Sequence, residues 1–262
     1  MGCHGGLPIL AYDWIHNNYI TDETCSIYLA RGHDNGGECS AMKMCRNCSP
    51  GEACVVPDQY LEYGVDEYDG VYGEEAMMQE LYQRGPIACG VAVPDSLESY
   101  KGGIYEDTTG DLNIVHDISV VGWGVEDGTP FWTVRNSWGS HWGEDGFFRV
   151  VRGINNLAIE TNCSWATPLD TWTEPRWHNT TDAEKNDPRN DQTAYPFPQP
   201  TYKNEETFME NKNYGRVAQA YFEKGERRPE VHSWEMVANE DLPAVVDWRD
   251  MNVKNYVLEQ EP

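Results

Sequence analysis

Apolar and polar residues alternate along four segments in the middle of the chain. A period of two places every second side chain on one face, which is typical of a strand with one buried side. Val, Ile, Phe and Trp are frequent in these segments, and Gly, Asp and Pro separate them. The pattern predicts an antiparallel sheet or barrel formed by residues 87–93, 116–121, 129–136 and 146–151.

A helical pattern precedes these strands at residues 74–84. Met77 and Leu81 are four residues apart, as are Met78 and Tyr82, so each pair shares one helix face. Glutamates open the segment and a Gly-Pro pair follows it, which are start and stop signals for a helix. We expect the methionines to fill the core rather than to bind a ligand.

The first part of the chain gives weaker signals. A short helix is expected at residues 7–17, where Leu10 shares a face with Trp14, and its apolar face is expected to pack on a core. Residues 25–64 are rich in Gly, Cys, Asn and Asp, so we expect loops held by disulfides. Residues 60–72 alternate apolar and acidic positions, which indicates a strand with a turn.

The composition excludes several classes of partner. Lys and Arg total 19 against 44 Asp and Glu, a formal charge of −25, which disfavours nucleic acids and anionic membranes. The sequence lacks the run of about 20 apolar residues that a membrane span needs. It also lacks a basic segment followed by an apolar one, so no signal peptide is expected, and Met1 is expected to be an internal position.

One histidine and one asparagine have a spacing with chemical meaning. His116 begins an apolar run, and Asn136 lies two residues before Trp138. An imidazole that acts as a general base must be held in one orientation and tautomer, and a side-chain amide oxygen can accept its second N–H. An indole over that hydrogen bond would keep water out. The pattern indicates a His–Asn pair that serves a nucleophile.

All eight cysteines fall between residues 3 and 163, a density that is typical of an oxidising compartment. Cys45 and Cys48 have the spacing of zinc ligands, and with Cys39 and Cys54 they would make a metal site. Asn47-Cys48-Ser49 is also a glycosylation acceptor, which favours disulfides over zinc. We therefore expect neither a metal nor a cofactor.

Together with further motifs, the His–Asn pattern resembles the papain-like cysteine peptidases, and within that family the cathepsin X (cathepsin Z) group. The resemblance covers residue 2 to about residue 168. Its motifs are Cys3-His4-Gly5-Gly6, Asp22-Glu23-Thr24-Cys25, Gly85-Pro86-Ile87, Tyr100-Lys101-Gly102-Gly103-Ile104-Tyr105, His116 before Gly122-Trp123-Gly124, Asn136-Ser137-Trp138-Gly139, Trp142-Gly143 and Asn156-Leu157-Ala158-Ile159-Glu160.

The resemblance implies an α+β papain-like fold, with mostly the antiparallel β-barrel half and part of the helical half present. His116 and Asn136 would be catalytic residues, and Trp138 would support the site. Trp142, Gly5 and Gly6 would line a groove for a peptide. The alternatives are plain core aromatics for the two tryptophans and an ordinary turn for the glycines.

Two features depart from the family pattern. The family usually has Asn before the histidine and a small apolar residue after it, where this chain has Val115 and Asp117. The sequence raises the question of whether Asp117 acts on His116 or faces solvent. The family nucleophile lies in a Cys-Gly-Ser-Cys-Trp segment, with an oxyanion-hole Gln upstream, and this sequence contains neither. The chain alone is therefore expected to be inactive.

The resemblance also implies how the cysteines pair. The implied disulfides are Cys25–Cys45, Cys48–Cys54 and Cys89–Cys163. Cys3 and Cys39 are left unpaired, because their family partners lie in the half that precedes Cys3. Two leftover thiols in a disulfide protein indicate that a piece of the domain is missing. Glycosylation acceptor motifs occur at Asn47, Asn162 and Asn179.

The sequence changes character after about residue 171. Residues 1–170 are expected to be the later two-thirds of a peptidase domain, and residues 171–204 a polar, Pro-rich, disordered linker. Residues 205–241 resemble a prosegment with a weak helix at 205–224. Residues 242–262 contain Asp247-Trp248-Arg249 and resemble the start of a second peptidase domain. We expect residues 242–256 to dock onto residues 86–165.

These features predict a cysteine-type peptidase, present here as a fragment without its nucleophile, and the cathepsin X likeness suggests carboxypeptidase activity. The alternative is a non-catalytic pseudoenzyme or peptide-binding module. The expected partner is a peptide or protein substrate. The resemblance implies a lysosomal, vacuolar or extracellular location. The sequence does not indicate an oligomeric state.

Overall fold

The computed structural model describes residues 6–26, 39–48, 53–190 and 232–251. The chain divides into two compact units, each described by itself. Unit 1 comprises residues 1–6, 10–67 and 168–207, and unit 2 comprises residues 7–9, 68–167 and 208–262. Helices and strands are mixed in an α+β arrangement, as the sequence predicts. No helix among the described residues is both long and apolar enough to cross a membrane.

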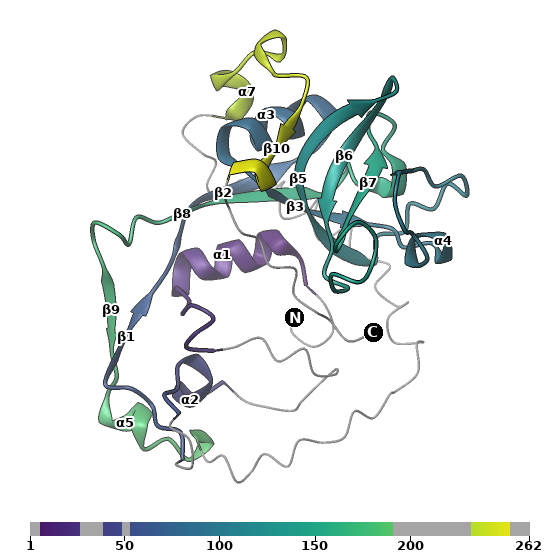
Figure 1. Ribbon diagram of the computed structural model, residues 1–262. Coiled ribbons are helices and arrows are strands. Elements are labelled where there is room, and N and C mark those ends of the chain that lie inside the picture. Colours follow the sequence, from purple (N-terminus) through teal and green to yellow (C-terminus); the bar gives the residue numbers. More distant parts are fainter. Residues whose placement is uncertain (1–5, 27–38, 49–52, 191–231, 252–262) are drawn as a thin grey trace. The chain divides into compact units, whose positions relative to one another are not determined.

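An eight-stranded sheet dominates unit 2 (Figure 1). Seven strands follow the order β2-β8-β3-β5-β6-β7-β4, and β10 pairs with β5 outside that path. The four predicted strands appear in it as β3, β5, β6 and β7, joined by antiparallel pairing. The strand bounds are β2 Val65–Val71, β3 Ile87–Val91, β4 Ile104–Tyr105, β5 His116–Glu126, β6 Thr129–Arg135, β7 Phe147–Val151, β8 Cys163–Pro168 and β10 Val246–Asp247.

Helix α3, Glu74–Arg84, covers part of the core of unit 2 and has the predicted bounds. Met77 and Leu81 are fully buried in this core, and the partly buried Met78 packs against it, so both methionines fill the core as predicted. Trp123 and Trp132 from the sheet are the largest fully buried side chains there. The short helices α4, Asp95–Glu98, and η1, Asn156–Ala158, complete this part of unit 2.

The disulfide Cys89–Cys163 joins β3 to β8 in the core of unit 2. Both cysteines are buried, and their residues are also opposite each other in the strand pairing. This bond was implied by the family resemblance. It closes a long stretch of chain that contains β5, β6 and β7.

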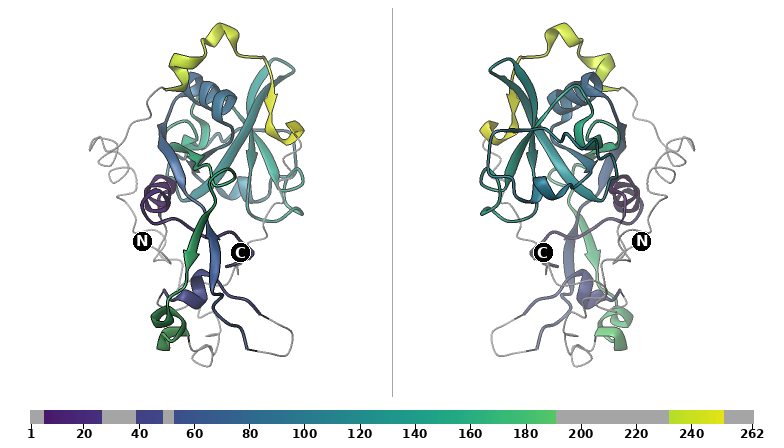
Figure 2. Two further views of the ribbon diagram at one scale, coloured as in Figure 1. Left: turned by 90° about the vertical axis from the view of Figure 1, so that its left-hand side faces the viewer. Right: turned by 90° about the vertical axis from the view of Figure 1, so that its right-hand side faces the viewer.

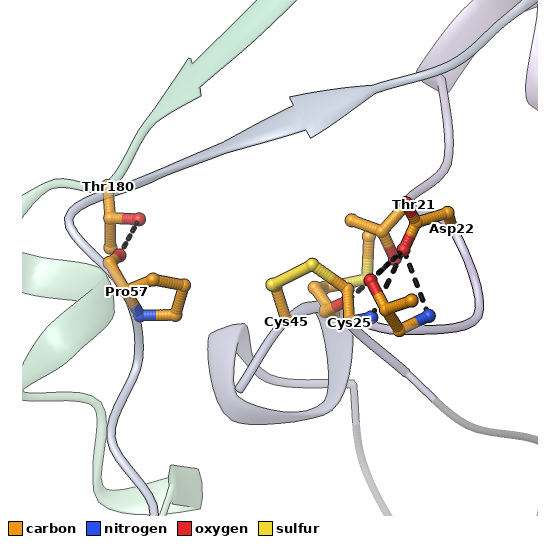
Figure 3. The surroundings of a disulfide bond; sticks show 8 residues. Thr21, Asp22, Cys25, Cys45, Pro57 and Thr180 are labelled. Atoms are coloured by element: carbon orange, nitrogen blue, oxygen red, sulfur yellow. Dashed lines mark hydrogen bonds between the residues drawn. A yellow bond between two sulfur atoms is a disulfide. The ribbon is translucent and has the colours of Figure 1, made fainter. Parts of the chain in front are cut away.

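Unit 1 has little regular structure and is held by disulfides. Cys25–Cys45 and Cys48–Cys54 are both present, so the sulfurs of Cys45 and Cys48 are engaged and the zinc alternative is not supported. Beside the first disulfide, the Asp22 carboxylate accepts the N–H groups of Thr24 and Cys25 (Figure 3). The elements are α1 Pro8–Asn18, α2 Ala41–Met44, β1 Gln59–Glu62, β9 Arg176–Asn179, α5 Asp182–Lys185 and η2 Pro188–Asn190.

Helix α1 forms where the sequence predicts it, but its expected core face is not buried. Trp14 is 46% exposed, and Ile9 is the buried residue of the helix. His16 Nδ1 lies 2.8 Å from the carbonyl oxygen of Val65 and ties the helix to the chain entering β2. Helical spacing identified the helix, but it could not show what covers each face.

The predicted linker does not begin at residue 171, because residues 176–190 form β9, α5 and η2. Strand β9 pairs antiparallel with β1, and the rings of Tyr60 and His178 stack with centroids 4.7 Å apart. Thr180 donates a hydrogen bond of 2.7 Å to the carbonyl of Pro57 (Figure 3). Thr181 caps α5 in a capping box with Glu184. The remaining linker residues and the predicted helix at 205–224 lie outside the described residues.

The C-terminal strap, residues 232–251, packs on unit 2 (Figures 1 and 2). It contains α7 Ser233–Met236, η5 Asn239–Asp241, β10 and η6 Trp248–Met251. Val246 pairs with Trp123 of β5 and is buried in the core cluster. Trp248 donates its indole N–H to the carbonyl of Leu81 over 2.8 Å. The predicted docking is confirmed for the described part of residues 242–256.

Gly122 gives the strap its close approach to β5. A Cβ at Gly122 would collide with the carbonyl oxygen of Val246 and would lie 3.0 Å from Asp247 Cα. The β5–β6 register also shifts between Val120 and Gly122, which is a β-bulge or a similar irregularity. Close backbone packing therefore requires glycine at this position.

Gly122→Ala is expected to weaken strap docking. Overpacking of this kind costs about 1–3 kcal/mol, so the strap should open about 5- to 160-fold more often. Limited proteolysis with mass mapping would measure cleavage at residues 243–249. The control is Val125→Ala, since Val125 is half exposed on the same strand and pairs with β6 rather than β10. Equal cleavage rates in the two variants would contradict the role given to Gly122.

Candidate active site

His116 and Asn136 meet on adjacent strands of unit 2. His116 is the first residue of β5, and Asn136 directly follows β6. His116 Nε2 lies 2.8 Å from Asn136 Oδ1. An amide oxygen can only accept, so Nε2 carries the hydrogen, and Nδ1 is the proton acceptor of the neutral ring. The structure thus brings together the two residues that the sequence singled out.

Backbone contacts hold each member of the pair in place. Val115, just before His116, donates its N–H to Val91 of β3 over 3.0 Å. Asn136 is buried, and its N–H is bound to the carbonyl of Gly146 over 3.0 Å. Its Oδ1 also accepts the N–H of Ser137 at 2.8 Å, which fixes the side-chain orientation. The sequence reasoning missed Gly146, although its positive φ of 87° fits a required glycine.

The Asn136 amide nitrogen differs from the rest of the pair in its hydrogen bonding. Nδ2 is buried and has no hydrogen-bond partner among the described residues. A buried donor without a partner is costly, and such groups concentrate at functional sites. This observation agrees with a site whose remaining groups lie outside the described part of the chain.

The two tryptophans near the pair have different positions. Trp138 stacks on His116, with ring centroids 5.2 Å apart and an interplanar angle of 23°. Trp142 is only 5% exposed, packs edge-on against Trp138 and donates its N–H to the carbonyl of Glu98 over 2.9 Å. Trp138 is therefore placed to shield the pair. Trp142 fits the alternative of a core aromatic residue better than a role in lining a peptide groove, because little of its indole is accessible.

The ring of His116 is mostly removed from water. Burial disfavours the charged imidazolium and lowers the pKa of His116, while the hydrogen bond to Asn136 opposes this shift. Asp117 is exposed, as expected for the neighbouring position on a strand. The balance favours a neutral imidazole that is able to accept a proton near neutral pH.

An NMR titration of the His116 ring is expected to give a midpoint below the ordinary histidine pKa. In Asn136→Ala the midpoint should fall further, because the lost hydrogen bond favours the charged form. Asp117→Asn is the control and should leave the midpoint unchanged. A midpoint that rises in Asn136→Ala would contradict the orientation assigned to this pair.

The remaining predicted residues fall elsewhere. Gly5 and Cys3 lie outside the described residues, and Gly6 belongs to unit 1, so the glycine wall stays a prediction. Cys39 is an exposed free cysteine of unit 1. The side chains of Asn47 and Asn179 are exposed, whereas Asn162 is partly buried beside the disulfide-bonded Cys163.

No described cysteine in unit 2 is free to serve as a nucleophile, because Cys89 and Cys163 are bonded to each other. The described residues likewise show no cluster of three or more residues suited to bind a metal ion. A hollow of about 380 Å³ in unit 2 does not include His116 or Asn136. It is lined by Trp123, Glu126, Phe131, Thr133, Glu144, Arg149, Val245, Asp247 and Arg249.

Known proteins share this combination of sequence and fold. A family model described as papain family cysteine protease matches residues 1–167. Cathepsin Z of Onchocerca volvulus is 43% identical over 176 residues, which cover 64% of this chain and 56% of that protein. Cathepsin B-like cysteine proteinase 1 of Haemonchus contortus is 34% identical over 175 residues, which cover 61% of this chain and 51% of that protein.

A solved structure gives a similar result. The structure of proCathepsin B S9 from Trypanosoma congolense matches with a TM-score of 0.51 and 30% sequence identity, covering 63% of this chain and 54% of that chain. The chain therefore spans about half the length of the curated relatives that it matches.

Proposed function

Because this chain belongs to the papain family of cysteine proteases, we propose that His116 and Asn136 form the proton-transfer half of a cysteine-peptidase active site. The observation that carries the proposal is the 2.8 Å contact between His116 Nε2 and Asn136 Oδ1, under the ring of Trp138. It leaves Nδ1 as the basic nitrogen of a ring whose burial favours the neutral form.

The proposed reaction uses a cysteine that this sequence does not provide. His116 would take the thiol proton, and the thiolate would attack the carbonyl carbon of a peptide bond. His116 would then return that proton to the leaving amine as the acyl-enzyme forms. Asn136 would hold the imidazole in the required tautomer throughout. The nucleophile and the oxyanion-hole Gln would come from a segment outside the given sequence, and the chain alone is expected to cleave nothing.

The substrate is proposed to be a peptide or protein. The likeness to a cathepsin Z supports removal of residues from a substrate C-terminus as the finer activity. The relatives also support a lysosomal or extracellular location, which agrees with the three disulfides. Under this proposal, residues 242–262 are the start of a second peptidase segment, and the strap occupies the site on unit 2 that such a segment fits.

A chimera would test the proposal. The part of the Onchocerca volvulus cathepsin Z that lies outside the aligned region would be joined to residues 1–167 of this chain. Hydrolysis of a fluorogenic peptide by the chimera, and its loss when the joined nucleophilic cysteine is replaced by Ala, would support the proposed function. A folded chimera that binds peptides but does not cleave them would instead favour a non-catalytic binding module.

A further inference from the structure

A buried carboxyl group lies between α3 and the C-terminal strap, away from the His116–Asn136 pair. Glu80 of α3 is 1% exposed, and Ser233 at the start of α7 is fully buried. One carboxylate oxygen, Oε2, accepts a hydrogen bond of 3.0 Å from Arg84. The other oxygen, Oε1, and the hydroxyl oxygen of Ser233 are buried without a well-formed hydrogen bond to any described residue. This is an unusual position for an acid that no proposed chemistry uses.

Uncharged contacts surround this carboxyl and hold the strap. Gln79, next to Glu80 on α3, donates to the carbonyl of Val237 over 3.1 Å and to Asn239 Oδ1 over 2.8 Å. Trp123 donates its indole N–H to the carbonyl of Pro243 over 3.2 Å. Figures 1 and 2 show the strap running along α3 and then β5. Glu80 is thus a buried titratable group beside the hydrogen bonds that hold the strap.

The surroundings of Glu80 have opposing effects on its pKa. Burial disfavours its charge and is the largest effect, and the nearby Asp69 of β2 adds repulsion. Arg84 on α3 and the Ser233 hydroxyl on α7 favour the ionised form. The net result is a pKa of Glu80 above its ordinary value. On α7, the other titratable residues are His232 and Glu235, which bond to each other through His232 N and Glu235 Oε2 over 3.0 Å.

We propose that the C-terminal strap is a pH-sensitive latch, closed at lower pH when Glu80 is neutral and loosened at higher pH when Glu80 is charged. The Ser233 hydroxyl can bond to the carboxyl in either protonation state, so the two states differ chiefly in the burial of a charge. An ionised carboxylate can only accept, and its burial under the strap costs free energy that hydration would recover when the strap opens. The latch is independent of the proposed peptidase activity.

The direction of the pH effect follows from linkage. A group whose pKa is raised in the closed state contributes stability that is fully present below its pKa in the open state. That contribution is lost as the pH rises through the closed-state pKa. Strap docking is therefore strongest at the acidic end of the range. Strand β5 begins at His116 and pairs with β10, so the latch acts on the strand that carries the histidine.

Hydrogen exchange on the full chain measures strap docking directly. Protection factors for the amides of residues 244–248, corrected for intrinsic rates, are compared at about pH 5 and about pH 7.5. The parent chain should lose protection at least severalfold at the higher pH. Glu80→Gln should keep the acidic level of protection at both values. The matched control is Glu75→Gln, an exposed acid on the same helix, which should behave like the parent chain.

A second variant separates the latch from a merely structural contact. Removing the Ser233 hydroxyl in Ser233→Ala removes a group that favours ionised Glu80, so the loss of protection should move to higher pH. A structural role alone would lower protection equally at every pH. His232→Gln should retain the pH dependence of the parent chain. The same pH dependence in Glu80→Gln as in the parent chain, or protection that increases with pH, would overturn the proposal.

Discussion

Replacing His116 with Ala in the chimera is expected to lower peptide hydrolysis by about 10²–10⁴-fold. The reason is that Nδ1 of His116 is the group proposed to remove the thiol proton, while its Nε2 is held by Asn136 Oδ1. The measurement is kcat/KM on a fluorogenic peptide. The same chimera with the parent His116 supplies the reference rate.

Two further variants make this expectation specific. Asn136→Ala should reduce the rate less than His116→Ala, since it removes the group that orients the base and leaves the base in place. Asp117→Asn should leave the rate close to that of the parent chimera, because Asp117 is exposed and the pKa shift of His116 comes from burial and from Asn136. A chimera that retains its full rate without His116 would contradict the proposed function.

The sequence predicted the sheet and its His–Asn pair because both depend on local signals. Period-two alternation located β5 and β6, and strands joined by a short turn pair with each other, so His116 and Asn136 were bound to meet near the same end of the hairpin. The backbone hydrogen bonds that hold Asn136 and His116 in place could not be predicted. The carbonyl of Gly146 reaches Asn136 only because the turn after residue 139 folds back.

The segment at residues 176–190 shows where sequence patterns fail. It is polar and nearly free of aliphatic residues, so its composition favoured a disordered linker. Its structure depends on partners more than a hundred residues away in the sequence. Arg176 pairs with Glu62 over 3.1 Å, and His178 stacks on Tyr60. Long-range ion pairs and ring contacts of this kind leave no periodic signal.

The strap was predicted to dock because its residues resemble the start of a peptidase domain, and the physical reason became visible only in the structure. The indole of Trp248 packs beside Gly85, and a Cβ built at Gly85 would lie 3.6 Å from the indole ring. The absence of a side chain at Gly122 allows the β10 backbone to pack closely on β5. Glu80 could not be identified from the sequence at all. Acids on an amphipathic helix are usually solvated, and nothing in the sequence indicates that this one is buried.

Removing the Cys89–Cys163 disulfide is expected to destabilise unit 2 by about 4 kcal/mol. The two cysteines are separated by 74 residues, so the bond excludes a large number of conformations from the unfolded chain. The double variant Cys89→Ala/Cys163→Ala would be compared with the parent chain. Hydrogen exchange of the β3 and β5 amides at increasing urea concentrations measures the free energy of unfolding of unit 2 separately from that of unit 1.

The Cys48–Cys54 disulfide provides the matched control. Its cysteines are separated by 6 residues, for which the same loop argument gives only about 2 kcal/mol, and that effect should be confined to unit 1. Equal urea midpoints for the β3 and β5 amides with and without Cys89–Cys163 would contradict the loop argument. The loop closed by that bond contains β5 and β6, so the bond also restricts the hairpin that places His116 against Asn136. Because the proposed catalytic pair spans two strands, the same covalent link is expected to stabilise both the fold and the geometry on which the proposed chemistry depends.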